Sequence, residues 1–412
     1  MGKVREQKNL IVGLDIGTSK IVALVAEILV DGRFEIVGMG EYPSRGLKKG
    51  VVVNIESTVN AIQRALEEAE LMADCKIREV YTGIAGSHIR SFSSHGMVAI
   101  KDKEVTQADV DRVIETARAI NIPMDQRIVH VLTQEFIVDG QEDVREPLGM
   151  SGVRLETKVH IVTGAASAAE NIVKCVKRCG LEVRDLILQP LASSYSVLSE
   201  DEKDLGVCLV DIGGGTTDIA VFTHGAIRHT AVIPIAGDQI TNDIAMALRT
   251  PTKEANDIKH RYGCALRQLA DAQATVEVPG VGGRSSRRLS HQTLAEVIEP
   301  RIEELYTLVQ AELRRSGFED IVSSGIAITG GCAVMRGMVE LGEEVFHMPV
   351  RIGVPHYDGG FAEVARNPRF ATAVGLLHIG FEQSQRELLA QIQSGSMTHV
   401  LNRVKHWFQG NF

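Results

Sequence analysis

A strand, a glycine turn and a second strand follow one another twice in this chain, and that repeat constrains the fold more than any other feature. In one copy, residues 209–222 place consecutive glycines between two apolar runs. In the other copy, nearer the N-terminus, Asp15 and Gly17 lie between the apolar runs 10–14 and 21–25. Both copies continue through a further turn with glycine and a third strand. A repeat spaced by about half the chain predicts two similar halves that face each other across a cleft.

The glycines of the later copy, Gly213 to Gly215, have the chemistry of an anion site. They allow positive φ, and they place no side chain between the backbone N–H groups and an anion. Asp211 and Asp218 flank the turn. Because two carboxylates repel a bare phosphate, they fit a ligand that carries a hydrated divalent cation. A run of glycines alone is most often a flexible turn, so the repeat carries the prediction of a metal-bound nucleoside polyphosphate.

Composition excludes several other classes of protein. With 412 residues, 44% hydrophobic and 24% charged, the chain has the composition of a soluble globular protein with room for more than one domain. Its net charge of −9 argues against a dedicated nucleic-acid binder. The six cysteines form no Cys-x-x-Cys pair and are interpreted as reduced thiols of a cytosolic protein. We expect no signal peptide, and no apolar run reaches the ~20 residues of a membrane-spanning helix.

The rhythm of the pattern changes along the chain and predicts its domains. An α+β segment interrupts the first half, and alternating helices and strands return after Gly164. The predicted units are a first lobe of residues 1–83 with 163–195 and 360–381, an insertion subdomain of residues 84–162, a second lobe of residues 196–359 with an outer subdomain of residues 242–315, a flexible linker of residues 382–396, and a terminal helix of residues 397–412.

The terminal helix has an unusual composition. It contains the only Trp of the chain and no acidic side chain, and it follows a segment rich in Gln, Ser and Glu. Such a helix fits a weak, reversible position in a membrane interface, which self-association would strengthen by avidity. A helix docked on its own core is the alternative. The residues predicted to contact the membrane are Val400, Leu401, Val404, Trp407 and Phe408 on the apolar face, with Arg403 and Lys405 on the polar face.

These features together resemble the actin, Hsp70 and sugar-kinase superfamily and, within it, the FtsA family of bacterial cell-division proteins. Residues 15–20 resemble the first phosphate motif of the superfamily, residues 211–218 the second, and residues 329–331 its adenosine motif. Residues 189–194 and 373–377 resemble its two connecting helices. The resemblance implies an α/β, actin-like (ribonuclease H-like) two-lobed ATPase fold. It also implies an α+β insertion subdomain and a C-terminal amphipathic helix.

The resemblance further implies a site for ATP and Mg²⁺. Asp15 and Asp211 would hold Mg²⁺ through water, and Gln189 would position an attacking water. Hydrolysis would be slow at best, since no strong general base is evident. Lys259 matches a ribose-binding position, although Asn256 stands where relatives often carry Glu. The implied nucleotide-binding residues are Asp15, Gly17, Thr18, Ser19, Lys20, Asp211, Gly213, Gly214, Gly215, Thr216, Thr217, Asp218, Gly237, Lys259, Gly330 and Gly331.

The implied partners are those of a division protein. The C-terminal tail of the tubulin-like FtsZ would bind near Arg301 and Glu304, where the alternative is a solvated helix face. The chain would polymerise with itself on an anionic membrane, at the cytoplasmic face of the bacterial inner membrane, and would recruit later division membrane proteins through the insertion. Two alternatives remain open. A small-molecule kinase of the same superfamily would need a carboxylate base and would leave the tail unexplained, and an Hsp70-like chaperone would need a β-rich peptide-binding domain.

Overall fold

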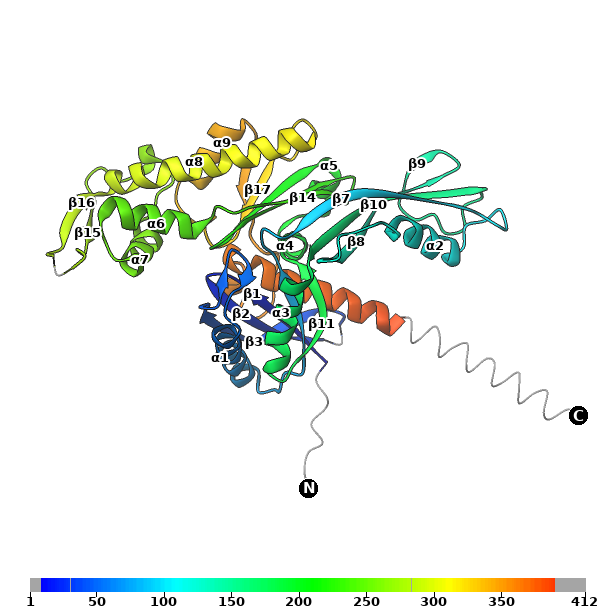
Figure 1. Ribbon diagram of the computed structural model, residues 1–412, viewed down its shortest axis with the longest axis horizontal. Coiled ribbons are helices and arrows are strands. Elements are labelled where there is room, and N and C mark those ends of the chain that lie inside the picture. The colour runs from blue at the N-terminus through cyan, green and yellow to red at the C-terminus, as the bar shows by residue number, and fades with distance from the viewer. Residues whose placement is uncertain (1–8, 30, 283, 390–412) are drawn as a thin grey trace, which may run out of the picture.

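The computed structural model describes residues 9–29, 31–282 and 284–389. Two lobes, each built on its own sheet, lie side by side, and a third unit extends from them beside the second lobe (Figure 1). The predicted terminal helix, residues 397–412, lies outside the described residues, as do residues 390–396 of the predicted linker.

The sheet of the first lobe combines an antiparallel meander with two parallel strands, in the order β11-β6-β1-β2-β3. The strands β1 and β2 are mostly apolar and buried along nearly their whole length because both faces of the sheet are covered there. Val12 and Leu14 lie in the core that includes the α1 side chains, while Ile11 packs with residues of a helix at 371–389 on the other face. The strands are β1 (Leu10–Ile16), β2 (Lys20–Ile28), β3 (Phe34–Pro43), β6 (Glu79–Ile84) and β11 (Glu182–Leu188), and the helices α1 (Ile55–Ala73), α3 (Ala166–Arg178) and α4 (Gln189–Val197).

The sheet of the second lobe repeats that arrangement strand for strand. Its order is β14-β13-β12-β17-β18, with three antiparallel strands followed by two parallel ones. The internal repeat predicted from the two glycine turns is therefore confirmed. The strands are β12 (Val207–Ile212), β13 (Thr217–Thr223), β14 (Ala226–Ile233), β17 (Ile326–Thr329) and β18 (Val350–Ile352).

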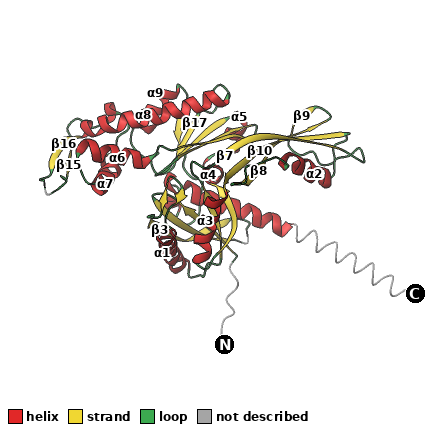
Figure 2. Ribbon diagram, viewed as in Figure 1, coloured by secondary structure: helices red, strands yellow, loops and turns green. Residues whose placement is uncertain are grey.

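Helices cover the outer side of the second lobe, where Figure 2 shows them gathered around the end of the sheet. The longest, α8, is capped by the side chain of Ser290 at its start and ends at Gly317 in the left-handed conformation. A short hairpin of β15 and β16 lies beside it. The remaining elements here are α5 (Glu200–Leu205), α6 (Gly237–Leu248), α7 (Thr252–Tyr262), β15 (Thr275–Val278), β16 (Arg287–Ser290), α8 (His291–Ser316), α9 (Met338–Phe346), α10 (Ala362–Ala365) and 3-10 turns at Arg267–Leu269 and Pro368–Phe370.

The insertion forms a separate sheet in the order β7-β10-β8-β9, with one helix packed against it. That helix, α2, begins with a capping box, in which Thr106 and Asp109 cap each other's backbone N–H groups. The insertion also touches the edge strand of the second lobe, where Ser91 Oγ donates to the Thr230 carbonyl at 3.0 Å. Its elements are β7 (Arg90–Ala99), α2 (Gln107–Arg118), β8 (Gln126–Val138), β9 (Gln141–Val144) and β10 (Arg154–Ala165).

The last described helix corrects the predicted linker. It covers residues 371–389, so residues 382–389 are helical where a flexible segment is predicted. Glu, Gln, Arg and Leu, which make up most of this stretch, are good helix formers. Arg184 Nη2 of the first lobe also donates to Glu387 Oε2 at 2.5 Å, which fixes the helix to the sheet. The composition of the segment indicated its polarity correctly but not its conformation.

The two predicted connecting segments cross at the junction of the lobes. A Cβ atom on Gly375 would lie only 1.8 Å from the Ala192 carbonyl oxygen of α4. The helix of residues 371–389 therefore approaches α4 at backbone distance, which the absence of a side chain at Gly375 permits. Side chains of α4 such as Leu191 and Val197 join the core that the two sheets share.

Candidate functional site

The two glycine turns meet between the lobes. Each turn is closed by the same hydrogen bond, from Gly17 N to Lys20 O and from Gly213 N to Thr216 O, both at 3.0 Å. A Cβ atom on Gly214 would lie 2.9 Å from the Cβ of Ser19 in the opposite turn. The hairpins, which we call phosphate hairpin 1 (residues 13–22) and phosphate hairpin 2 (residues 210–219), can approach so closely only because glycine has no side chain.

Three buried carboxylates lie at the base of these hairpins. Asp15 is 8% exposed, Asp211 9% and Asp218 5%. Gln189 Nε2 donates to Asp15 Oδ1 at 3.0 Å, and Ser193 Oγ donates to Asp211 Oδ2 at 2.7 Å. No described group hydrogen-bonds to Asp218 Oδ1, although that atom is buried. A buried acceptor without a partner is costly and indicates that something else belongs beside it.

Burial also changes the ionisation of these groups. The pKa of Asp15 is raised to about 7, chiefly by loss of hydration; the charge of Lys20 opposes this rise and the neighbouring charge of Asp211 adds to it. Burial and the charge of Asp211 together raise the pKa of Asp218 to about 8. The pKa of Asp211 is raised as well, chiefly by burial. A cation placed among them would remove this repulsion.

The donor set fits a hydrated Mg²⁺ ion. Carboxylate oxygens are ligands that Mg²⁺ prefers, and the ion usually keeps several waters and takes phosphate oxygens. Within the described ranges, no group of three or more His, Cys, Asp or Glu side chains is arranged to hold a metal ion directly. Asp15 and Asp211 are the residues that would hold such an ion, through water and together with the oxygens of a bound ligand.

Lys20 carries the positive charge of phosphate hairpin 1. Its Nζ donates to the Arg369 carbonyl at 2.5 Å and lies 4.2 Å from the centre of the Phe370 ring. Burial and the charge of Arg369 lower the pKa of Lys20 to about 8, while the surrounding carboxylates oppose that shift. The ammonium group is thus held near Asp15 and Asp211.

The predicted adenosine residues adjoin phosphate hairpin 2. Gly330 has φ +88°, and a Cβ atom there would lie 2.4 Å from Asp211 Oδ1. The site therefore requires glycine at position 330. For Gly331, by contrast, no described atom lies within 4 Å of a Cβ. The backbone at residue 331 is open to a flat ligand.

Lys259 and Gly237 complete this side of the site. Lys259 Nζ donates to the Gly237 carbonyl at 2.9 Å and to Thr241 Oγ1 at 2.8 Å. Gly237 N in turn donates to Gly213 O at 3.1 Å, which ties α6 to phosphate hairpin 2. Asn256, at the position where a Glu is expected, only accepts a 3.4 Å contact from Thr241 Oγ1. The structure therefore brings together the predicted nucleotide-binding residues of both lobes, including Thr216 and Thr217.

Several site residues escape prediction from the sequence. Thr372 Oγ1 lies 3.0 Å from Ser193 Oγ, and both hydroxyl groups contact Asp211 Oδ2. These two residues are 179 positions apart. Asp238 N also donates to the Gly214 carbonyl at 2.8 Å. The only sequence signal is the run of serines within the otherwise apolar stretch at 191–198.

Arg301 and Glu304, predicted to bind a partner, lie on the exposed side of α8. Arg301 is held by two hydrogen bonds to Asp243 of α6, from Nε at 2.5 Å and from Nη2 at 3.1 Å. It also forms an ion pair with Glu304. The Arg301 side chain is 27% exposed and the Glu304 side chain 49% exposed, so both can be reached from outside.

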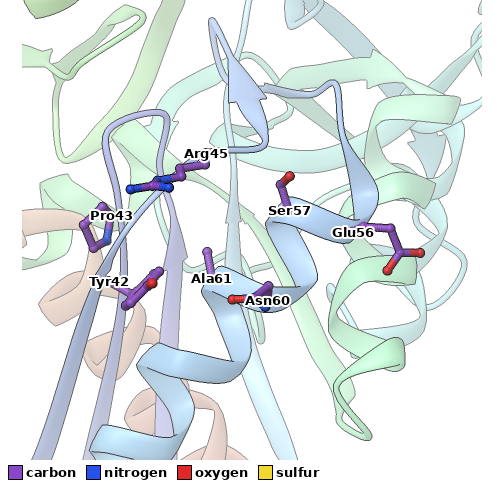
Figure 3. Close-up of a pocket in the computed structure, with 7 residues that line it drawn as sticks. All are labelled: Tyr42, Pro43, Arg45, Glu56, Ser57, Asn60 and Ala61. Carbon is purple, nitrogen blue, oxygen red and sulfur yellow. The ribbon is translucent and has the colours of Figure 1, made fainter. Parts of the chain in front are cut away.

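Two surface depressions lie apart from these residues. One, of about 360 Å³, is formed by the end of β3 and the first turns of α1 (Figure 3). Its lining residues are Tyr42, Pro43, Arg45, Glu56, Ser57, Asn60 and Ala61. The other, of about 280 Å³, is lined by residues that include Asn9 and Leu388, so both ends of the described chain meet at one groove. Neither depression includes a residue of the phosphate hairpins. We place the candidate site at the hairpins because they combine buried carboxylates with closely approaching glycine turns.

No helix within residues 9–29, 31–282 and 284–389 combines the length and the apolar character that crossing a membrane requires.

Comparison with known proteins agrees with this architecture. Residues 208–375 match the family model of cell division protein FtsA, and residues 86–163 match that of the SHS2 domain inserted in FtsA. Cell division protein FtsA of Pseudomonas aeruginosa is 62% identical over 418 residues, with 100% of both chains covered.

Two solved structures share the fold. The PilM–PilN type IV pilus biogenesis complex gives a TM-score of 0.66 at 16% identity, with 90% of this chain and 98% of the other covered. MreB5 of Spiroplasma citri bound to ADP gives 0.57 at 14% identity, with 92% and 98% covered. These likenesses show an actin-like fold. With the full-length match at 62% identity, they establish that the chain belongs to the FtsA family of cell division proteins.

Proposed function

We propose that this chain is an ATP-binding division protein that polymerises on the inner face of the cytoplasmic membrane, anchors the FtsZ ring there and recruits later division proteins. The observation that carries the proposal is the meeting of two phosphate hairpins over buried Asp15 and Asp211, beside a third carboxylate with an unpartnered oxygen. Such a site is unfavourable when empty and is completed by a metal-bound polyphosphate.

Each lobe has a defined task in nucleotide binding. The backbone N–H groups of both phosphate hairpins would contact the phosphates, and Lys20 would add a positive charge. Mg²⁺, when bound, would neutralise phosphate charge. Gln189 already donates to Asp15 at 3.0 Å, which places its amide where it would orient a water molecule. An amide orients water without removing its proton, so we expect slow hydrolysis and a mainly structural role for ATP.

The membrane attachment that we propose rests on the terminal segment. The five apolar side chains predicted to share one face of a helix would offer several kcal/mol of gross burial at ~1.5 to 3 kcal/mol each, before ordering costs. The helix of residues 371–389 supports this geometry because it is fixed to the first lobe through Arg184 and Glu387. Residues 390–412 therefore start from a defined point on the lobe.

Co-sedimentation with anionic vesicles in Mg·ATP tests the attachment. The full chain should pellet, and a chain that ends at Gln393 should remain in solution while it still binds ATP. Val404→Glu and Asn402→Glu form a matched pair, since both add one negative charge but only the first lies on the apolar face. We expect Val404→Glu to release the protein and Asn402→Glu to weaken it only slightly. Pelleting of the truncated chain, or its failure to bind ATP, would contradict the proposal.

The proposed surface for the FtsZ tail uses Arg301 and Glu304. Because Asp243 holds the Arg301 guanidinium in place, the surface is ordered before a partner binds, which lowers the entropic cost of binding. Titration of a labelled FtsZ C-terminal peptide measures this. Arg301→Ala should abolish binding, and Asp243→Asn, which keeps the arginine but loosens it, should weaken binding by a smaller factor. Equal affinity of all three proteins would exclude this surface.

The alternative, a small-molecule kinase, predicts transfer of phosphate from ATP to an acceptor. Its requirement is a carboxylate base directed at a hydroxyl group. The three buried carboxylates instead converge on the phosphate hairpins and have pKa values raised by burial. Assay of ATP consumption with pooled sugars and polyols distinguishes the two, because a division protein should consume no more ATP with acceptors than without.

A further inference from the structure

A small hairpin lies between the phosphate hairpins and the base of the insertion. It consists of β4 (Leu47–Lys48) and β5 (Val51–Val52), joined by a turn at Lys49 and Gly50. Both turn residues have positive φ, +51° for Lys49 and +76° for Gly50, so the turn has a fixed, tight shape. We call residues 47–52 the β4–β5 hairpin.

The tip of the β4–β5 hairpin touches both phosphate hairpins. Gly50 N donates to Thr18 Oγ1 of phosphate hairpin 1 at 3.0 Å. A Cβ atom on Gly215 of phosphate hairpin 2 would lie 3.0 Å from Lys49 Cα. The position of the tip therefore depends on where both hairpins lie. A polyphosphate that accepts N–H groups from both would fix their separation, and with it the position of the tip.

The same tip touches the segment that begins the insertion. A Cβ atom on Gly50 would lie 2.9 Å from the Ala85 carbonyl oxygen and 2.9 Å from Gly86 Cα. From the other side, a Cβ on Gly86 would lie 3.1 Å from the Lys49 carbonyl oxygen. No side chain separates the two segments, so movement of the tip is transmitted directly to the backbone at Ala85 and Gly86.

The two chain connections of the insertion lie close together at the segment that contains Ala85 and Gly86. The chain enters the insertion through this segment and leaves it at Ala165, where Ala165 N donates to His88 Nδ1 at 3.4 Å. The insertion is also hydrogen-bonded to β14 of the second lobe, where His160 Nε2 lies 3.0 Å from Thr230 Oγ1. The insertion is thus covalently connected to the first lobe and hydrogen-bonded to the second. If the separation of the lobes changes, the backbone at the base of the insertion has to change conformation.

We propose that the β4–β5 hairpin is a mechanical link that transmits nucleotide binding at the phosphate hairpins to the base of the insertion subdomain. The link rests on the proposed nucleotide binding. It gives the chain a route by which the phosphate site sets the position or the order of residues 84–90. The insertion can then present its surface differently in the nucleotide-bound and nucleotide-free protein.

Hydrogen–deuterium exchange on the full chain, with and without Mg·ATP, tests the link. We expect nucleotide to slow exchange in residues 13–20 and 211–217, and also in residues 84–90, by about tenfold where the local opening equilibrium shifts. Gly86 has φ +127°, and the Cβ added in Gly86→Ala would press against the Lys49 carbonyl. This substitution should abolish the nucleotide-dependent protection of residues 84–90 only. Protection of the phosphate hairpins should remain.

A control separates this contact from backbone strain. Gly140→Ala places alanine at φ +91° in the same subdomain, where no described atom lies within 4 Å of its Cβ, and should behave as the wild type. Gly50→Ala disturbs the same contact from the β4–β5 hairpin. Its control is Gly32→Ala, which places alanine at a similar φ of +79° where no described atom lies within 4 Å of the Cβ. Each pair is compared only after thermal melting shows both proteins to be folded.

The outcomes distinguish the link from the function on which it rests. Protection of residues 84–90 that persists in both Gly86→Ala and Gly50→Ala overturns the link and leaves nucleotide binding intact. So does a wild-type protein in which nucleotide protects the phosphate hairpins but not residues 84–90. If Mg·ATP protects neither region of the wild type, the proposed nucleotide binding fails and the link fails with it.

Discussion

Phosphate hairpin 1 and phosphate hairpin 2 have the same backbone and opposite chemistry. Their closing hydrogen bonds align Gly17 with Gly213, so that Lys20 corresponds to Thr216. Two residues further on, the first hairpin has Val22, paired across the strands with Asp15, where the second has Asp218, paired with Asp211. One copy thus supplies a cation and the other an additional carboxylate. The two halves of a repeated fold therefore differ in charge, because one carries a lysine where the other is richer in carboxylate oxygens.

The supports of the two equivalent aspartates differ in the same way. Asp15 receives an amide N–H from Gln189, whereas Asp211 receives hydroxyl groups from Ser193 and Thr372. Both supports come from helices at the junction of the lobes, so the hydrogen bonds of each carboxylate depend on how the lobes are placed. The comparison teaches that the two halves are not interchangeable, and substitutions can measure how far their roles differ.

The largest effect is expected at the two aspartates. Asp15→Asn and Asp211→Asn each remove a carboxylate that would hold Mg²⁺ through water, and each should weaken Mg·ATP binding on the order of 100-fold. Isothermal titration with and without Mg²⁺ measures this. Asp320→Asn, at an exposed position, is the control. If one of the two site variants binds as the wild type does, only the other lobe holds the metal.

A second contrast uses the glycine pair beside Asp211. Gly330→Ala forces φ +88° on alanine and directs a Cβ at Asp211 Oδ1, so we expect a loss of about 2 kcal/mol in the free energy of unfolding. Gly331→Ala meets no described atom within 4 Å and should change that free energy by less than ~0.5 kcal/mol. Urea unfolding measures both. Equal losses would show that neither the positive φ of Gly330 nor its approach to Asp211 distinguishes it from Gly331.

Most of this site could be predicted from the sequence because its chemistry is local. Asp15 and Gly17, like Asp211 and Gly213, lie within one turn, and these residue types are typical of a turn that binds a metal-bound phosphate. Ser193 and Thr372 could not be predicted, because helix packing brings them together across 179 residues. The role that we propose for the β4–β5 hairpin could not be predicted for the same reason, since it depends on contacts with the distant residues Gly215 and Gly86.

The fold shows the same division between local and distant causes. Two apolar runs around a glycine turn fix each meander, so the repeat is visible in the sequence. The end of the last helix is not, because the Gln- and Ser-rich composition after residue 381 resembles a linker. Contacts of Gln383 with Asp185 and of Glu387 with Arg184 hold residues 382–389 in a helix against the first lobe. Those partners are some 200 residues away, and no local pattern announces them.

A smaller, pH-dependent effect is expected at Asp218, in protein free of metal and nucleotide. Its pKa is about 8 in the folded chain against an ordinary 3.8, so the folded state keeps a proton that the unfolded state has released. The free energy of unfolding therefore falls as pH rises from about 4 to 8. Asparagine does not titrate, and Asp218→Asn should raise the melting temperature by a few degrees at pH 8 and little at pH 4. An equal gain at both pH values would show that the ionisation of buried Asp218 is not the cause.

The smallest effect tests the cationic half of the comparison. Lys20→Thr makes phosphate hairpin 1 resemble phosphate hairpin 2 at the position of Thr216. Because the Lys20 ammonium is one charge among many N–H contacts, its loss should weaken ATP binding by only about fivefold. It should weaken ADP binding less, since ADP has one phosphate fewer. Lys48→Thr removes the same charge from an exposed position of the β4–β5 hairpin and should leave both affinities unchanged. Competition binding of ATP and ADP measures the ratio. A fall in ADP affinity as large as that for ATP would place Lys20 at the phosphates that ATP and ADP share. The difference between the two hairpins would then affect binding of the whole polyphosphate and not only of its terminal phosphate.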